Sequence, residues 1–420
     1  MKLCVKNACH LGAKVDLFVS NGKVVNMVPS GKMDISEEFE VFDAKGLLLF
    51  PSFIDAHVHL REPGYEYKED INSGLNAALH GGYGAVMCMA NTNPCNDSAS
   101  VTSLMIEKAK KSHPHGPKLY PIAAASIGLK GEVMAPLSEL KDAGCIAVSN
   151  DGRPVHNTEL LRHIMEYAAD LNMIFIDHCE DADFAKGWLM NEGDVSGFLG
   201  VKGQPAMGEA IQAMRDIMLA EYLNIPVHIA HVSSKLTIDV IKFGKDRGVK
   251  VSAETCPHYL ILTDSAVDGY NTLAKVSPPL RTEEDRDALL EAVKSGLIDI
   301  LVTDHAPHAA HEKETTLDLA PFGFTGLDLA LSLVWKLVNE KKLKEADIHR
   351  LMSKRPAEIF NLPYNNFDPN DPADFFLFDP KEKWEVKPEN LYSKSHNTPF
   401  LGQTLCGRVK HHFLAGKKLC

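Results

Sequence analysis

The sequence predicts an α/β protein, a (β/α)8 TIM-type barrel with a small β-sandwich formed by both chain termini. Through the middle of the chain, eight short apolar runs alternate with amphipathic stretches. This alternation is typical of repeated β-then-α units around a parallel barrel. The two ends show instead the two-residue alternation of half-buried strands, which predicts a separate β structure.

The predicted sandwich combines residues 1–50 with residues 366–420. Near the first end, AKVDLFVSNGKVVNMV holds two alternating runs around an Asn-Gly pair. Near the other end, ADFFLFDPKEKWEV and GRVKHHFLAGKKLC repeat the pattern. Asn-Gly between such runs favours a tight turn. Residues 51–365 are assigned to the barrel domain, inserted between the two halves of the sandwich.

The barrel elements follow in chain order. The expected strands are Leu49–Asp55, Gly84–Ala90, Lys118–Ala124, Cys145–Ser149, Met173–Asp177, Pro226–Ala230, Lys250–Glu254 and Asp299–Thr303. The segments between them include the amphipathic stretches 98–113, 157–172, 207–224 and 283–296, whose apolar residues recur at helical spacing.

Composition narrows the possible functions. The chain has 420 residues, of which 45% are hydrophobic and 24% charged, and a formal net charge of -12. This charge argues against a nucleic-acid or membrane surface, and we see no apolar run of bilayer length. The nine cysteines are scattered without CxxC spacing, which favours reduced thiols. Because the N-terminus also lacks a signal-type core, we expect a cytoplasmic protein.

The first chemical signal is the pair His57 and His59. Both follow the apolar run LLLFPSFI at 47–54, which we interpret as a buried strand. Residues two apart in an extended strand point the same way, so the two imidazoles form a potential metal clamp. Taken alone, the pair is equally well explained as surface histidines or as histidines bound to carboxylates.

Other polar residues fall at corresponding places after later strands. Active sites of such barrels lie at the carboxyl ends of the strands, so these residues are expected to meet there. They are Asn91, Asp151, His178, His231 and Asp304. Four imidazoles with carboxylates suit zinc or a similar ion. Six candidate ligands suggest two metals that share one carboxylate and a hydroxide of lowered pKa.

Asp304 suits a second role in this cluster. It can accept a proton from the hydroxide and return it to a leaving nitrogen. The implied chemistry is metal-assisted hydrolysis of an amide-like bond.

The motifs also resemble a known family, the class I dihydroorotases of the amidohydrolase superfamily. The resemblance covers nearly the whole chain. It rests on DAHVHLREPG, KEDINSGLNAALHGGYGAVMCMANTNP, SNDGRPV, DHCED, HIAHVSS, PHYLILTD, SPPLR, TDHAPH and SKSHNTPFLGQTLCGRV, in that order. It implies the reversible cyclisation of N-carbamoyl-L-aspartate to (S)-dihydroorotate, a step of pyrimidine synthesis.

The resemblance implies metal roles as well. His57 and His59 would bind one Zn²⁺, and His178 and His231 the other. Asp151 would bridge the two ions together with a hydroxide. Asp304 would be both a ligand of the first ion and the catalytic acid–base. Many relatives bridge with a carboxylated lysine after the fourth strand, but IAVSNDG has no lysine there, which favours the dihydroorotase interpretation.

An anionic substrate needs a cationic partner, and Arg61 follows His59 by two residues. If the strand stays extended, its guanidinium lies on the same side and can bind a carboxylate; pairing with Glu62 or Asp70 is the alternative. By resemblance, Asn91 and His308 are further substrate contacts, as is the main chain at Phe322 and Gly323. Ser277, in SPPLR, stands where the family commonly has asparagine, so its contact with the substrate is expected to be weaker.

Two other functions stay open at this point. One is another cyclic amidohydrolase, such as an allantoinase or hydantoinase, since AETCPHYL also resembles allantoinase relatives. The other is a catalytically silent subunit that scaffolds a partner. By resemblance, a homodimer or a transcarbamoylase partner is expected. We interpret His228 and His258 as structural, and His305 as support for a neighbouring ligand.

Overall fold

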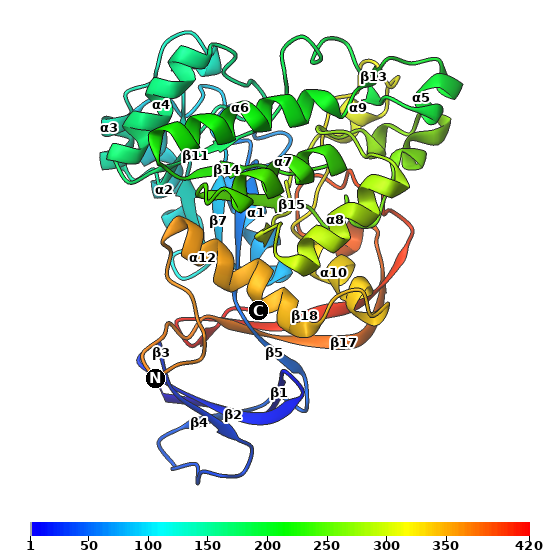
Figure 1. The fold of residues 1–420 in the computed structure, drawn as a ribbon. Coiled ribbons are helices and arrows are strands. Elements are labelled where there is room, and N and C mark those ends of the chain that lie inside the picture. The colour runs from blue at the N-terminus through cyan, green and yellow to red at the C-terminus, as the bar shows by residue number, and fades with distance from the viewer. Residues whose placement is uncertain (1) are drawn as a thin grey trace.

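In the computed structural model, which describes residues 2–420, eight parallel strands surround a central axis (Figure 1). They are β6 (Phe53–Val58), β7 (Tyr83–Cys88), β8 (Lys118–Pro121) continued by β9 (Ala123–Ala124), β10 (Ala147–Ser149), β11 (Ile174–Asp177), β14 (Val227–Ile229), β15 (Val251–Thr255) and β16 (Ile300–Leu301). Each strand pairs in parallel with its neighbour in chain order. A bridge between Val58 and His305 joins the last strand to the first, so the predicted barrel is confirmed.

Helices cover the outside of the barrel (Figure 1). They are α1 (Ile71–Gly81), α2 (Ala99–Ser112), α3 (Leu137–Ala143), α4 (Thr158–Asp170), α5 (Asp194–Leu199), α6 (Met207–Leu223), α7 (Lys235–Asp246), α8 (Glu283–Ser295), α9 (Ala310–Lys313), α10 (Ala330–Asn339), α11 (Glu345–His349) and α12 (Arg355–Phe360). Side-chain caps fix several starts; Asp70 and Thr282 each accept a hydrogen bond from the third residue of their helix. Within residues 2–420, none of the helices has the length and apolar character needed to cross a bilayer.

Strands from both ends of the chain form one eight-stranded sheet below the barrel (Figure 1). Its members are β1 (Lys2–His10), β2 (Ala13–Ser20), β3 (Lys23–Pro29), β4 (Glu40–Asp43), β5 (Leu48–Pro51), β17 (Phe375–Glu385), β18 (Thr404–Leu414) and β19 (Lys417–Lys418). Side chains from both ends, including Leu17, Leu49 and Phe375, pack in a core of its own. This sheet is consistent with the predicted terminal sandwich. Asn21 and Gly22 both have positive φ, 52° and 76°, in the turn between β2 and β3, as Asn-Gly predicts.

One predicted strand has the wrong bounds. The apolar run that suggested Leu49–Asp55 is divided between two sheets, because β5 pairs with β17 and β6 pairs with β7. The barrel strand therefore starts at Phe53 and contains His57, which was expected to follow it. Both halves are buried, and Ser52 between them is buried as well, so no exposed residue marks the place where the chain passes from one sheet to the other.

A small two-stranded element lies outside the barrel. β12 (Met190–Asn191) and β13 (Gly203–Gln204) pair in parallel around α5, between the fifth and sixth barrel strands. Its polar side chains hold part of the wall of the cavity described next.

Candidate metal centre and active site

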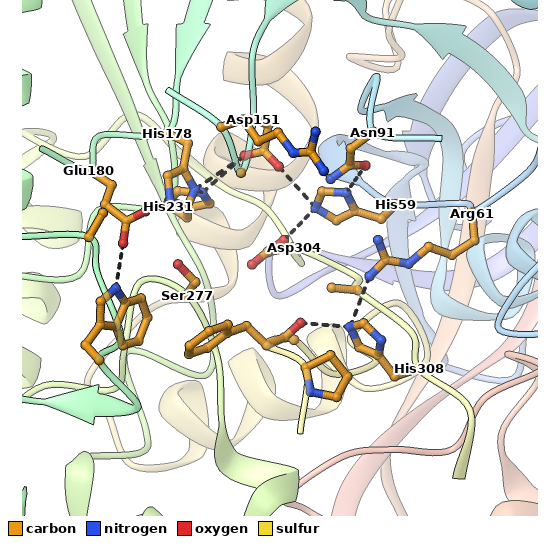
Figure 2. Close-up of a pocket in the computed structure, with 18 residues that line it drawn as sticks. His59, Arg61, Asn91, Asp151, His178, Glu180, His231, Ser277, Asp304 and His308 are labelled. Atoms are coloured by element: carbon orange, nitrogen blue, oxygen red, sulfur yellow. Dashed lines mark hydrogen bonds and ion pairs between the residues drawn. The ribbon is translucent and has the colours of Figure 1, made fainter. Parts of the chain in front are cut away.

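The predicted site residues meet at the carboxyl ends of the barrel strands, around a cavity of about 540 Å³ (Figure 2). His59, Arg61, Asn91, Asp151, His178, His231, Ser277, Asp304, His308, Phe322 and Gly323 all line it. His57 lies beneath them and is fully buried. The structure thus brings together every site residue expected from the sequence.

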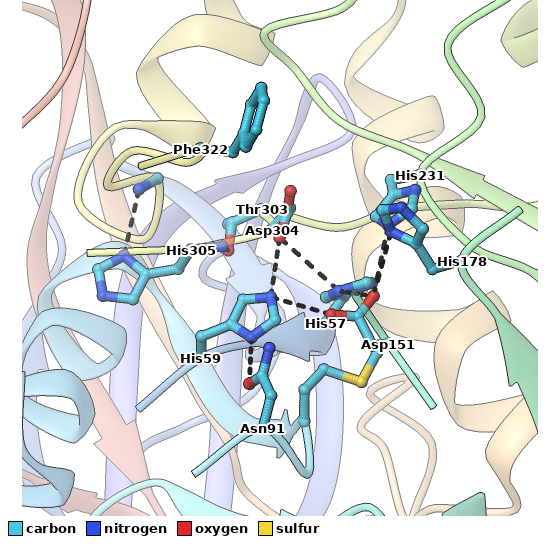
Figure 3. A network of polar contacts seen from close by, with 12 residues as sticks. His57, His59, Asn91, Asp151, His178, His231, Thr303, Asp304, His305 and Phe322 are labelled. Atoms are coloured by element: carbon cyan, nitrogen blue, oxygen red, sulfur yellow. Dashed lines mark hydrogen bonds and ion pairs between the residues drawn. The ribbon is translucent and has the colours of Figure 1, made fainter. Parts of the chain in front are cut away.

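Asp151 is the centre of the cluster (Figure 3). Its carboxylate oxygens lie 3.4 Å from Nε2 of His57 and 3.7 Å from Nε2 of His59. On its other side they lie 3.5 Å from Nδ1 of His178 and 3.5 Å from Nε2 of His231. Two groups able to hold a metal ion therefore share Asp151, one with His57 and His59 and one with His178 and His231.

The atoms of the cluster fit a metal better than a network of hydrogen bonds. Nε2 of His57 and Oδ1 of Asp151 are buried and have no hydrogen-bond partner within residues 2–420. Nδ1 of His178 and Nε2 of His231 lie 2.8 Å apart, within hydrogen-bond distance, and each lies 3.5 Å from Oδ1 of Asp151, so these donor atoms converge on one point. A set of imidazoles and carboxylates is a donor set that zinc-like ions prefer.

The negative charge of Asp151 and positive charge on the surrounding imidazoles stabilise each other. Burial alone would raise the pKa of Asp151, but the imidazoles of His57, His178 and His231 hold it well below its usual range. Burial likewise opposes a charge on His178, yet Asp151 raises the pKa of this histidine to about 9. The site is therefore built around a permanent anion that attracts positive charge.

Asn91 orients His59. Its Oδ1 accepts a hydrogen bond from Nδ1 of His59 at 2.8 Å, so Nε2 is the ring nitrogen of His59 that faces Asp304 and Asp151. The same bond engages the amide oxygen of Asn91 and leaves its NH₂ group as the donor for the cavity. Asn91 thus carries a structural role that the sequence did not suggest, next to the predicted contact with substrate.

His308 connects Arg61 to the opposite wall of the cavity (Figure 2). Burial lowers the pKa of His308 to about 3, so the ring is neutral. Nδ1 lies 3.3 Å from the ammonium group of Lys68 and accepts a hydrogen bond from it. Nε2 therefore carries the ring proton and donates to the carbonyl oxygen of Phe322 at 2.8 Å.

Arg61 reaches the cavity by a different route from the one expected. The chain does not stay extended after His59, because Arg61 has a φ of 61°. Its Nε donates to the carbonyl oxygen of Pro307 at 3.1 Å, which anchors the guanidinium beside His308. His231 and Asp304 also have positive φ, 29° and 48°. Such left-handed conformations are uncommon outside glycine and concentrate at functional sites.

Two buried lysines hold the wall that carries Phe322 and Gly323. Lys275 donates to the carbonyl oxygen of Ala320 at 2.7 Å, and Lys313 to that of Pro321 at 2.7 Å. Burial lowers the pKa of Lys275 to about 8 and that of Lys313 to about 7. Gly323 has a φ of 112°, and a Cβ there would lie 2.6 Å from Cβ of Ala306. The close approach of this loop to the site therefore requires glycine.

Trp188 and Glu180 are among the residues of the cavity wall that sequence reasoning missed. Trp188 packs on Phe322 with ring centroids 4.4 Å apart, and its Nε1 donates to Glu180 at 2.8 Å. Glu180 lies 3.9 Å from Nε2 of His178. The sequence signal that could have identified Glu180 was its place in DHCED, two residues after the predicted ligand His178.

The ring of His305 does not make the expected contact with a neighbouring ligand. Its Nδ1 accepts from the backbone of Gly326 at 3.1 Å, and its Nε2 faces Glu69 at 3.2 Å. It supports the loop beside the site and contacts no predicted ligand through its ring nitrogens. His228 departs from the prediction of a plain core histidine, because it hydrogen-bonds to the acid that holds His57.

The sequence of this chain is similar to a known family model and to known proteins over nearly its whole length. Residues 46–237 match the family model described as dihydro-orotase-like. The dihydroorotase of Syntrophus aciditrophicus (strain SB) is 43% identical over 410 residues, which are 98% of this chain and 96% of that protein. The dihydroorotase of Ruminiclostridium cellulolyticum is 44% identical, over 99% of this chain and 98% of that protein. The chain belongs to the dihydroorotase family.

Similarity to solved structures extends the comparison at the level of the fold. The L-hydantoinase (dihydropyrimidinase) from Arthrobacter aurescens superposes with a TM-score of 0.86 at 22% identity, covering all of this chain and 96% of that one. At this identity the likeness shows the shared fold alone. The expectation of a dihydroorotase-type cyclic amide hydrolase is therefore confirmed through the family, and the hydantoinase alternative has no better support.

Proposed function

We propose that this enzyme of the dihydroorotase family interconverts N-carbamoyl-L-aspartate and (S)-dihydroorotate. The observation that carries the proposal is the sharing of Asp151 by two metal-capable groups beside a guanidinium. A ring amide placed over Asp151 would meet the hydrolytic groups while its carboxylate meets Arg61. The close relatives named dihydroorotase support this choice of substrate over an uncharged cyclic amide.

The proposed cofactor is a pair of Zn²⁺ ions bridged by Asp151 and a hydroxide. His57, His59 and Asp304 would hold one ion, and His178 and His231 the other. When bound, the ions polarise the scissile carbonyl and lower the pKa of the attacking water. The nitrogen and oxygen donors of the cluster support this identity of the metal.

Substrate binding would depend on residues of the opposite wall. Arg61 and the amide NH₂ of Asn91 would bind the substrate carboxylate, and His308 would stay neutral beside them. The main chain at Phe322 and Gly323 would contact the ring, with Ser277 making a shorter-reaching contact. These groups fix the position of the amide carbonyl over Asp151, which is the main contribution that binding residues make to such a reaction.

Asp304 is the proposed proton carrier. Nε2 of His59 lies 3.1 Å from Oδ1 of Asp304, and His59 and His57 hold the pKa of Asp304 below its usual value although burial opposes this. The carboxylate is therefore ionised when the reaction begins. It would take a proton from the attacking water and give it to the ring nitrogen as the C–N bond breaks. Cyclisation would use the same steps in reverse.

The test is a substrate panel on the purified protein reconstituted with zinc. Ring opening of (S)-dihydroorotate is measured beside allantoin, hydantoin and dihydrouracil. Turnover of dihydroorotate alone is expected. Turnover of only an uncharged ring would retain the metal site and discard the role of Arg61, and metal-loaded protein without any turnover would support a silent scaffold or a missing partner.

The proposed place of action is the cytoplasm. The nine cysteines are all unpaired in the part of the chain that the structure describes, and reduced thiols are typical of that compartment.

A further inference from the structure

Glu254 is a fully buried acid next to the metal centre, and neither the proposed mechanism nor the sequence motifs assign it a role. It lies on β15, and its carboxylate contacts side chains of the adjacent strand β14 and of β6. Oε1 lies 2.7 Å from Nδ1 of His57, and Oε2 lies 3.0 Å from Nε2 of His228. The backbone N–H of His231 also donates to Oε1, at 3.3 Å. An acid buried so deeply needs partners of this kind.

The far end of this chain of contacts is also defined. Nδ1 of His228 lies 2.7 Å from the hydroxyl of Ser252. Because Glu254 accepts from Nε2 of His228, that nitrogen carries the proton, and Nδ1 accepts the proton of the Ser252 hydroxyl. Hydrogen-bond donation therefore runs from Ser252 to His228 and from His228 to Glu254, and Glu254 also accepts from His57.

The consequence for His57 is a fixed tautomer. Nδ1 donates to Glu254, so Nε2 is the nitrogen left for a metal ion, and it faces Asp151 at 3.4 Å and Asp304 at 3.7 Å. The carboxylate also fixes the plane of the ring. A metal-binding imidazole whose second nitrogen donates to a carboxylate is held in its binding orientation and is a more basic ligand.

We propose that Glu254, held in place by His228 and Ser252, is the positioning residue of the metal site formed by His57, His59 and Asp304. The inference rests on the proposed metal centre and adds to it a residue that touches neither metal nor substrate. It predicts that the two metal sites of one chain respond unequally when Glu254 is changed. Within residues 2–420 the imidazoles of His178 and His231 have no hydrogen bond to this carboxylate, and only the backbone N–H of His231 reaches it.

The experiment is a zinc titration of the purified full chain against a chromogenic chelator, without substrate. Glu254→Gln keeps the shape of the side chain and removes its charge and one acceptor. We expect the affinity of one site to fall about tenfold to a hundredfold, while the other site changes less than about threefold. His228→Gln should weaken the same site in the same direction.

His412→Gln is the matched control. His412 is equally buried and bonds the hydroxyl of Ser52 at 2.8 Å and the carbonyl oxygen of Leu79 at 2.7 Å, but it lies in the terminal sheet. Like His228, it bonds a serine hydroxyl, but its second partner is a backbone carbonyl oxygen and not an acid that holds a metal ligand. Both zinc affinities should therefore stay at wild-type values. Ser252→Ala, a milder change, keeps the test decisive if Glu254→Gln fails to fold, and it should weaken the same site by a smaller factor.

A second readout separates positioning from general destabilisation. Cobalt substituted for zinc should show a shifted visible spectrum in Glu254→Gln and an unchanged one in His412→Gln. Wild-type affinities and spectra in Glu254→Gln, His228→Gln and Ser252→Ala would overturn the inference and leave the proposed function standing. Equal weakening in His412→Gln would also overturn it, and a wild-type chain that binds no metal would refute the metal centre itself.

Discussion

Asp304 and His59 meet at 3.1 Å between Oδ1 and Nε2, although they come from the last and the first strands of the barrel. The contact exists because the bridge between Val58 and His305 closes the barrel at this point. It places the proposed proton carrier beside a metal ligand. Changes at this pair should therefore separate proton transfer from metal binding.

Asp304→Asn keeps the size of the side chain and removes its ability to accept a proton. We expect kcat to fall by about a thousandfold, because the proton of the attacking water has no acceptor at the right place. Metal analysis of the same protein should still find the site with His178 and His231 loaded. Turnover at the wild-type rate would refute the assigned role.

Arg61→Met removes the proposed carboxylate partner. Charge-assisted hydrogen bonds of this kind justify a rise in KM of about one to two orders of magnitude for dihydroorotate, with a smaller change in kcat. Arg153→Met is the control, because Arg153 also lines the cavity and its removal changes the net charge equally. Initial-rate kinetics of both variants give the two values of KM. An equal rise in KM in Arg61→Met and Arg153→Met would mean that the overall positive charge of the cavity, and not Arg61 itself, binds the anion.

Gly323→Ala should damage the cavity wall rather than the metal centre. The added methyl group would meet Ala306, so the loop with Phe322 must shift, and kcat/KM should fall about tenfold or more. Gly402→Ala is the control for backbone strain, since Gly402 has a φ of 76° and nothing within 4 Å of the added Cβ. This control should lose stability, by about 1 kcal/mol, and keep its kinetic constants.

The lowered pKa of Lys313 leads us to expect that the free energy of unfolding depends on pH. Its pKa in the folded chain, about 7, lies below the ordinary value of 10.5. Between these values the unfolded chain holds a proton that the folded chain has released, so the free energy of unfolding rises with pH. From pH 7 to pH 9 this group should add on the order of 2 kcal/mol.

Lys313→Met should therefore flatten the pH dependence of urea unfolding, whereas a change at the exposed Lys32 should leave it as in the wild type. A constant offset between wild type and Lys313→Met reports the lost hydrogen bonds, and only the slope reports the proton. Parallel curves across this range would contradict the lowered pKa of Lys313.

Much of the site could be predicted because a parallel barrel brings the carboxyl ends of all its strands to one rim. Asp151, His178 and Asp304 each follow an apolar run, and position after a strand is enough to place them on one rim. The same reasoning failed at Leu49–Asp55, where two strands of different sheets are both buried and read as one run. It also placed Arg61 for the wrong reason, because a positive φ leaves no mark on a non-glycine residue in the sequence.

Contacts between distant segments were beyond sequence reasoning. Glu254 sits in the largely buried strand Val251–Thr255, and a lone acid there gives no sign of which histidines it binds. His228 looked like a core residue for the same reason. Their roles follow only from the register of neighbouring strands, which sets which side chains face one another across the barrel interior.

The terminal sheet can form only after both ends of the chain have been synthesised. Strand β5 pairs with β17 through Phe50 and Phe376, so the early segment leaves the ribosome long before its partner exists. Until then its unpaired edge is exposed to other chains. We expect nascent chains shortened before Phe375 to be held by chaperones or to aggregate, although they already contain every residue of the catalytic cluster.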